Sequence, residues 1–180
     1  YDLGVELLFR GTADVMRRQI VPPISRWLAT RAADAPPARV LDVACGTGSA
    51  LRQVARARRG LRFAGLELSP NYAAAARRRL ADVPDLEIVE GNAEAMPYAD
   101  GAFDVVTCVY LFHELPRNAR RRVARELRRV LAPDGLLVVE DSAQLSEASD
   151  LEPALRTFAR EFHEPFFDDY LEDDLAVLLA

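Results

Sequence analysis

An acidic side chain, Asp42, lies inside the apolar run of residues 39–45, which ends in the small-residue turn Gly46-Thr47-Gly48. A strand, a tight turn and a helix start in this order present backbone N–H groups to a ligand at the edge of an α/β sheet. A carboxylate in an apolar strand is costly to bury without partners. We therefore expect donors for Asp42 at the strand end, either loop amides or the ammonium group of a ligand.

The spacing of the glycines separates two classes of cofactor. A dinucleotide fold uses G-x-G-x-x-G, whose third glycine allows close packing of helix and strand. Gly46 and Gly48 fit the first two positions, but Leu51 stands at the third. A second acid, Glu67, ends the expected strand 61–68 and follows Asp42 by 25 residues. A carboxylate at that place accepts hydrogen bonds from ribose hydroxyls in α/β nucleotide sites.

The stretch Val40-Leu41-Asp42-Val43-Ala44-Cys45-Gly46-Thr47-Gly48 resembles motif I of the class I S-adenosylmethionine-dependent methyltransferases. The resemblance extends along most of the chain and is greatest to the ubiquinone and menaquinone C-methyltransferases and to natural-product O- and C-methyltransferases. One departure is Ala44, where the family usually has glycine. The resemblance implies S-adenosylmethionine as cofactor and S-adenosylhomocysteine as product.

The resemblance also implies a role for each part of the cofactor site. Leu68 would cover one face of the adenine, Asn92 would meet its amino group, and the N–H of Ala93 would meet a ring nitrogen. The methionine ammonium would lie near the carbonyl of Ala44 and the end of the fourth strand, and Tyr1 and Arg10 are candidates for its carboxylate. The cofactor-binding residues expected in this way are Tyr1, Arg10, Asp42, Ala44, Cys45, Gly46, Gly48, Glu67, Leu68, Asn92, Ala93, Val109 and Tyr110.

His113 follows the fourth strand, at a position that borders the acceptor in related enzymes. Histidine titrates near neutral pH, so His113 is a candidate base for a hydroxyl or an acidic carbon. The alternative is a structural histidine that orients the loop. Methyl transfer from a sulfonium is an in-line displacement that depends mainly on positioning, so no catalytic triad is expected. The sequence shows neither metal-ligand spacing nor a serine or cysteine nucleophile elbow.

Strand and helix patterns alternate regularly along the chain. Strands are expected at 39–44, 61–68, 86–89, 103–111 and 136–140, with a turn at 132–135, and helices at 3–29, 47–58, 71–81 and 117–129. This alternation predicts an α/β fold, a doubly wound, mostly parallel Rossmann-like sheet with helices on both faces. Residues 150–180 read as helical. The two terminal strands usual in the family are absent from this pattern, which suggests a chain truncated at its C-terminus.

The 180 residues and net charge of −5 suit one globular domain and do not favour a nucleic-acid partner. We expect a helical lid over residues 1–34 and a cofactor-binding core over 35–180. All 23 basic residues are arginine, and the run from Arg117 to Arg129 is interpreted as the solvated face of an amphipathic helix. Two cysteines and no apolar membrane segment favour the cytoplasm. A homodimer is left open.

The sequence therefore predicts S-adenosylmethionine-dependent methyl transfer to an oxygen or carbon of a small, fairly apolar acceptor. A nicotinamide-dependent oxidoreductase is the alternative enzyme, disfavoured by Leu51 and by the absence of a Tyr-x-x-x-Lys pair. A cofactor-binding module without catalysis, which acts through interactions, is the non-enzymatic alternative.

Overall fold

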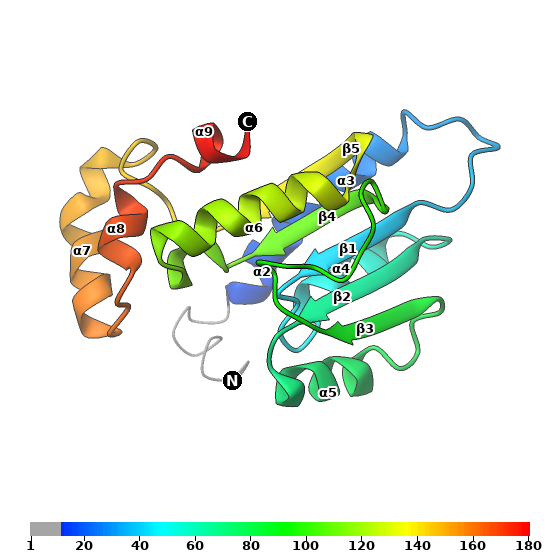
Figure 1. Ribbon diagram of the computed structural model, residues 1–180, viewed down its shortest axis with the longest axis horizontal. Helices are drawn as coiled ribbons and strands as arrows, with labels where there is room; N and C mark the ends of the chain where they lie inside the picture. The colour runs from blue at the N-terminus through cyan, green and yellow to red at the C-terminus, as the bar shows by residue number, and fades with distance from the viewer. Residues whose placement is uncertain (1–11) are drawn as a thin grey trace.

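A five-stranded parallel sheet forms the centre of the computed structural model, which describes residues 12–180 (Figure 1). The strand order is β3-β2-β1-β4-β5, and every neighbouring pair is parallel. The order reverses between β1 and β4, so the loops that follow these two strands diverge at the carboxyl edge, where α/β sheets bind ligands. The doubly wound fold predicted from the sequence is confirmed. The strands are β1 (Arg39–Val43), β2 (Arg62–Glu67), β3 (Leu86–Glu90), β4 (Phe103–Val109) and β5 (Leu131–Glu140).

Three helices cover one face of the sheet: α3 (Val21–Leu28), α4 (Ser49–Ala57) and α5 (Pro70–Arg79). Their apolar side chains form one core cluster with β1 and β2, and Ile20 and Ile24 are fully buried in it. The helix α5 begins as its sequence predicts, because the Ser69 hydroxyl accepts the N–H of Tyr72 and Pro70 stands in the first turn. Pro22 and Pro23 lie in the first turn of α3, where proline is tolerated because the first N–H groups of a helix have no partner within it.

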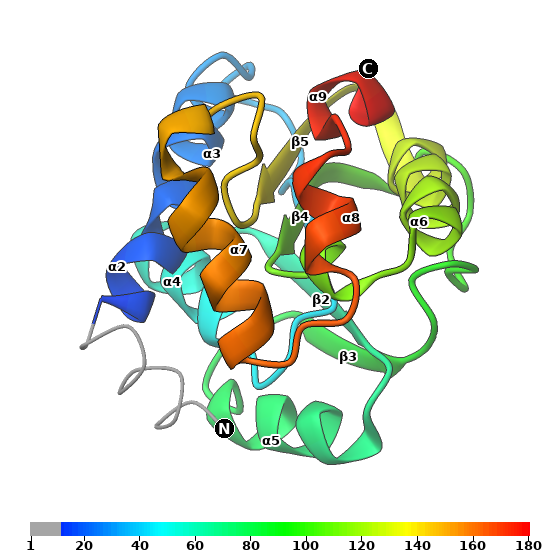
Figure 2. The same ribbon diagram turned by 90° about the vertical axis from the view of Figure 1, so that its left-hand side faces the viewer.

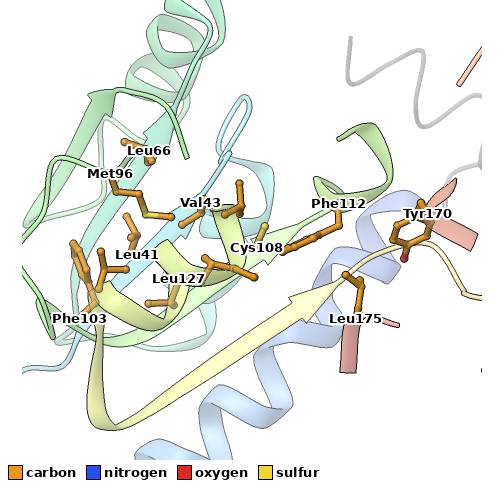
Figure 3. Close-up of a cluster of buried hydrophobic side chains, with 14 of the residues drawn as sticks. Leu41, Val43, Leu66, Met96, Phe103, Cys108, Phe112, Leu127, Tyr170 and Leu175 are labelled. Atoms are coloured by element: carbon orange, nitrogen blue, oxygen red, sulfur yellow. The ribbon is translucent and has the colours of Figure 1, made fainter. Parts of the chain in front are cut away.

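The helix α6 (Arg117–Val130) covers the other face, where a second core cluster continues beyond the strand ends. Figure 3 shows this cluster running from Phe103 past Leu127 to Phe112 and Tyr170. The C-terminal helices α7 (Glu152–Glu161) and α8 (Phe167–Leu171) lie beyond the carboxyl ends of the strands (Figures 1 and 2). The remaining short helices are α2 (Ala13–Arg17), η1 (Arg18–Ile20), η2 (Phe112–Glu114), η3 (Ser149–Leu151) and α9 (Leu175–Leu179).

Arg120 corrects the interpretation of the arginine run as a solvated face. Its side chain is 0% exposed and donates from Nε to Asp173 at 2.9 Å, from a second nitrogen to Leu115 O at 2.6 Å, and to the carboxylate of Asp169. A buried guanidinium needs such partners, since an unpaired buried charge is very unfavourable. Arg120 therefore anchors α8 and the following turn to α6.

The last strand was expected to begin after a turn at residues 132–135, but β5 already begins at Leu131. The pairing shifts there: Phe103 pairs with Leu131, and Val105 with Leu136. Residues 132–135 therefore stand opposite Asp104 alone. They form an irregularity like a β-bulge, which interrupts the pairing with β4 but does not end the strand. In the described part of the chain no strand follows β5. Every helix within residues 12–180 is too short or too polar to traverse a lipid bilayer.

Candidate functional site

The loop after β1 has an unusual backbone. Ala44, Gly46 and Gly48 have φ angles of 55°, 55° and 81°, the left-handed region that favours glycine. At Gly48 a Cβ atom would come within 2.6 Å of Leu80 Cδ1, so this position also lacks room for a side chain. These alternate left-handed residues turn the backbone sharply at the carboxyl edge of the sheet, immediately before α4.

Asp42 is buried at the end of β1, with 1% of its surface exposed. Its Oδ1 accepts a hydrogen bond from the Thr107 hydroxyl at 2.7 Å, but its buried Oδ2 has no hydrogen-bond partner within the described residues. Desolvation, together with the negative charge of Glu67, raises the pKa of Asp42 to about 7 although the Thr107 bond opposes this. A buried carboxylate oxygen without a donor fits a ligand that carries a positive charge.

Glu67 ends β2 and is itself buried. Its Oε2 accepts the N–H of Gly46 at 2.8 Å, and its Oε1 accepts the N–H of Ser69 at 2.8 Å. Because a carboxylate oxygen has two lone pairs, each oxygen keeps one for a further donor such as a ribose hydroxyl. Glu67 thus connects the β1 loop to the end of β2. The adjacent Leu68 is 68% exposed, an apolar side chain in the open beside a buried acid.

Asn92 follows β3, whose end is joined to that of β2 by a bond from Gly91 N–H to Glu67 O at 3.0 Å. The side-chain oxygen of Asn92 accepts the N–H of Glu94 at 2.8 Å, which makes a local turn, and the residue is exposed. The structure therefore brings Asn92 and Ala93 to the same edge as Glu67. Their contacts with an adenine ring stay a prediction.

Tyr110 lies directly after Val109 at the end of β4, with a φ of 57°. Its N–H bonds to Glu140 O at 2.8 Å, and its hydroxyl bonds to Glu140 Oε1 at 3.3 Å. Strained backbone of this kind concentrates at functional sites. Cys45 packs into the core cluster beside the β1 loop, and burial first, then nearby carboxylates, raise the pKa of its thiol. Its contact with a cofactor stays a prediction. A Cβ on Gly65 would meet its Sγ at 2.8 Å.

His113 lies in η2 and has a partner that sequence reasoning missed. Its Nδ1 lies 2.5 Å from Oδ1 of Asp141, the residue that follows β5. The two side chains are 12% and 2% exposed. Burial lowers the pKa of His113, but the hydrogen bond and charge of Asp141 outweigh this and raise it. No spacing rule could identify Asp141, because it follows His113 by 28 positions and all of α6 lies between them.

Three aromatic rings surround the imidazole of His113. The ring centroids of Phe167, Tyr170 and Tyr110 lie 5.9, 6.2 and 6.3 Å from that of His113. Phe167 and Tyr170 belong to α8, which the buried Arg120 holds in place. The C-terminal helices therefore supply part of the surroundings of the candidate base.

Two expected cofactor contacts, Tyr1 and Arg10, lie outside the described residues. A pocket of about 440 Å³ lined by Trp27, Asp104 and Gly135 lies at the opposite, amino edge of the sheet, away from these groups. In the part of the chain that the structure describes, no group of three or more His, Cys, Asp or Glu side chains is placed to hold a metal ion.

Comparison with known proteins shows the family to which the chain belongs. Residues 41–139 match the family model described as "Methyltransferase domain". Demethylmenaquinone methyltransferase from Thermotoga maritima is 34% identical over 139 residues, which cover 77% of this chain and 55% of that protein. Fatty-acid O-methyltransferase from Mycolicibacterium smegmatis is 34% identical over 123 residues, covering 68% of this chain and 44% of that protein.

A solved structure shares the fold. The CurJ carbon methyltransferase superposes with a TM-score of 0.67 at 18% identity, covering 78% of this chain and 38% of that chain. The present chain spans about half the length of the curated relatives it matches. With its family match, its relatives and its parallel Rossmann-like sheet, the chain belongs to the methyltransferase domain family.

Proposed function

We propose that this protein transfers the methyl group of S-adenosylmethionine to an oxygen or carbon of a small, fairly apolar acceptor. The observation that carries the proposal is the buried Oδ2 of Asp42, which lacks a donor in the described residues and lies beside a loop of left-handed backbone. An ammonium group would supply both the missing donor and the missing positive charge.

Other residues at the carboxyl edge would hold the remaining parts of the cofactor. Glu67 would accept the ribose hydroxyls through its free lone pairs, and the exposed Leu68 would cover the adenine. Asn92 and the N–H of Ala93 would meet the adenine edge, while Val109 and Tyr110 would border the methionine part. Cys45 would line the loop, and Tyr1 and Arg10 remain candidates for the carboxylate. When bound, the cofactor supplies a methyl group already activated on a sulfonium.

His113 is proposed as the base that accepts a proton from the acceptor. Its aromatic surroundings suit an apolar or aromatic molecule. The names of the relatives span a quinone precursor and a fatty acid, so they favour apolar acceptors of more than one chemistry. A soluble 1,4-naphthoquinol and a medium-chain fatty acid are therefore the first acceptors to test.

Two alternatives make different predictions. A nicotinamide-dependent oxidoreductase would bind NADH, and the family match favours the methyl donor over it. A module without catalysis would bind the cofactor but transfer no methyl group to any acceptor. A lid over residues 1–34, a homodimer and a cytoplasmic location stay predictions.

Glu67→Ala tests the cofactor site. We expect it to weaken S-adenosylhomocysteine binding by about 1–3 kcal/mol, the range for lost hydrogen bonds to a charged group. Isothermal titration calorimetry would measure this, with Glu87→Ala as the control because Glu87 is an exposed acid on the neighbouring strand β3. An unchanged dissociation constant for Glu67→Ala would show that the ribose is bound elsewhere.

Transfer itself is tested with S-adenosylmethionine labelled in its methyl group. We expect label in the naphthoquinol or the fatty acid, at a rate well above that without protein. Cofactor binding without transfer over a broader acceptor panel would contradict the enzymatic proposal and support the non-catalytic module.

A further inference from the structure

Asp141 is the centre of a compact hydrogen-bond arrangement at the ends of β4 and β5. Its Oδ2 accepts the backbone N–H groups of Leu111 and Phe112 at 3.1 and 2.7 Å. Its Oδ1 accepts the N–H of Ser142 at 2.8 Å and lies 2.5 Å from Nδ1 of His113. Three backbone N–H groups thus hold the carboxylate in place independently of the imidazole.

This arrangement decides which nitrogen of the neutral imidazole carries the proton. Ionised Asp141 is an acceptor only, so Nδ1 must be the protonated nitrogen in the bond between them. Nε2 then has the free lone pair, and it makes no hydrogen bond with any described residue. A general base needs such a lone pair within reach of the proton that it removes.

We propose, resting on the proposed function, that Asp141 is a positioning residue that makes His113 a base for weakly acidic hydroxyl groups, so that the acceptor is an aromatic alcohol such as a phenol or quinol. The three rings around His113 suit an aromatic acceptor. A carboxylic acid is already ionised at neutral pH and needs no base. A phenol, with a pKa near 10, does need one.

The proposed step balances as follows in protons and electrons. The lone pair on Nε2 of His113 takes the hydroxyl proton, which leaves the electron pair on the acceptor oxygen. That pair forms the new bond from oxygen to the methyl carbon. Where the conjugated ring carbon forms the bond instead, the hydrogen on that carbon leaves to solvent as a proton and the oxygen regains a proton, which restores the aromatic ring. The sulfur–methyl bond breaks and its electrons stay on sulfur. His113 then returns the proton to solvent.

Several charged or titratable groups act on His113 from the elements packed around it. They are Asp141 after β5, Glu114 in η2, Glu164 before α8, Tyr110 after β4 and Tyr170 in α8. The three carboxylates all raise the pKa of His113, and the hydrogen bond that His113 donates to Asp141 is the largest of these contributions. Loss of the Asp141 charge is therefore expected to lower the pKa.

The first test needs no acceptor, because the chain contains only two histidines. Nitrogen-15 NMR of the imidazoles distinguishes the two neutral tautomers and gives each pKa, and His163→Gln assigns the signals. We expect wild-type His113 to carry its proton on Nδ1. In Asp141→Asn the amide oxygen must accept the N–H groups of Leu111 and Phe112, so the amide NH₂ faces the imidazole. The NH₂ donates to Nδ1, which must then be unprotonated, and we expect the ring proton on Nε2. Asp134→Asn, at an exposed acid, is the matched control.

A wild-type proton on Nε2 would overturn the proposal even if Asp141→Asn does not fold. The second test measures transfer to 1,4-naphthoquinol by His113→Gln and Asp141→Asn across pH. We expect kcat/KM to fall about 100-fold at pH 7, the scale of general-base catalysis. The deficit of His113→Gln should shrink towards pH 10, where the quinol ionises unaided.

The two possible failures are distinguishable. The base role is overturned if neither variant lowers kcat/KM for the naphthoquinol, or if both lower it by the same factor at every pH. The proposed function stays intact in both cases. No transfer to the naphthoquinol or the fatty acid by wild-type protein contradicts the proposed function, and the base role with it.

Discussion

The substitution Asp42→Asn is expected to stabilise the free protein and to weaken cofactor binding at the same time. Burial raises the pKa of Asp42 to about 7, against about 3.9 for an unfolded aspartate. A difference of about 3 pH units corresponds to about 4 kcal/mol by which ionisation of Asp42 destabilises the folded state above pH 7. The introduced amide removes this charge but buries an N–H group, which costs about 1–3 kcal/mol. A net gain of about 1–3 kcal/mol at pH 8 follows.

The gain depends on pH in a defined direction. Because the folded pKa of Asp42 exceeds the unfolded value, the folded state binds the extra proton between pH 4 and pH 7. The wild-type protein therefore regains about 1.4 kcal/mol for each pH unit that the pH falls through this window, so the advantage of Asp42→Asn disappears between about pH 6 and pH 5 and reverses towards pH 4. Urea unfolding of both proteins at pH 8, 6.5 and 5 measures this difference directly.

The same variant should lose ligand-induced stability. S-adenosylhomocysteine raises the unfolding free energy by an amount that grows with the logarithm of its concentration divided by Kd, and loss of a charge-assisted bond weakens its binding by about 1.5–3 kcal/mol. The reasoning is refuted if Asp42→Asn is less stable than wild type at pH 8, or if the stability difference is independent of pH. Unchanged affinity for S-adenosylhomocysteine would separately refute the proposed contact with the ammonium.

The backbone of the β1 loop and the anchor of α8 give further predictions. Ala44→Gly should raise the unfolding free energy by about 0.5–1 kcal/mol with unchanged cofactor affinity, because the left-handed φ of 55° strains alanine; a lower melting temperature would count against this. Gly48→Ala should lower the free energy of unfolding by at least about 1 kcal/mol, since its Cβ would come within 2.6 Å of Leu80. An unchanged free energy in denaturant unfolding would contradict this. Arg120→Leu should destabilise by about 3–5 kcal/mol and increase hydrogen exchange in α8, whereas Arg121→Ala, at an exposed arginine of the same helix, should have little effect. Equal exchange in both variants would show that Arg120 does not anchor α8.

The sequence was most informative where local pattern and chemistry agree. The apolar run into Gly46 and Gly48 predicted the strand, the tight loop and the start of α4, and Glu67 was expected at the end of β2, where the structure has it. These features depend on neighbours close in sequence and on the fixed spacing of one strand–helix–strand unit. The doubly wound, mostly parallel sheet followed from the regular alternation of strands and helices.

Features that depend on distant segments could not be predicted from the sequence. Asp141 meets His113 only because β4 and β5 pair in register, with Val109 opposite Glu140. Arg120 looked like its neighbours in an arginine-rich helix, and only the docking of α8 distinguishes it. The free oxygen of Asp42 likewise depends on which donors the folded loop leaves available.

The measurement that tests the central claim most directly is calorimetric titration of the protein with S-adenosylhomocysteine and, separately, with NADH. We predict one-to-one binding of S-adenosylhomocysteine that Glu67→Ala and Asp42→Asn both weaken, with no binding of NADH. Binding of NADH alone would contradict the assignment of the β1 loop to a methyl donor.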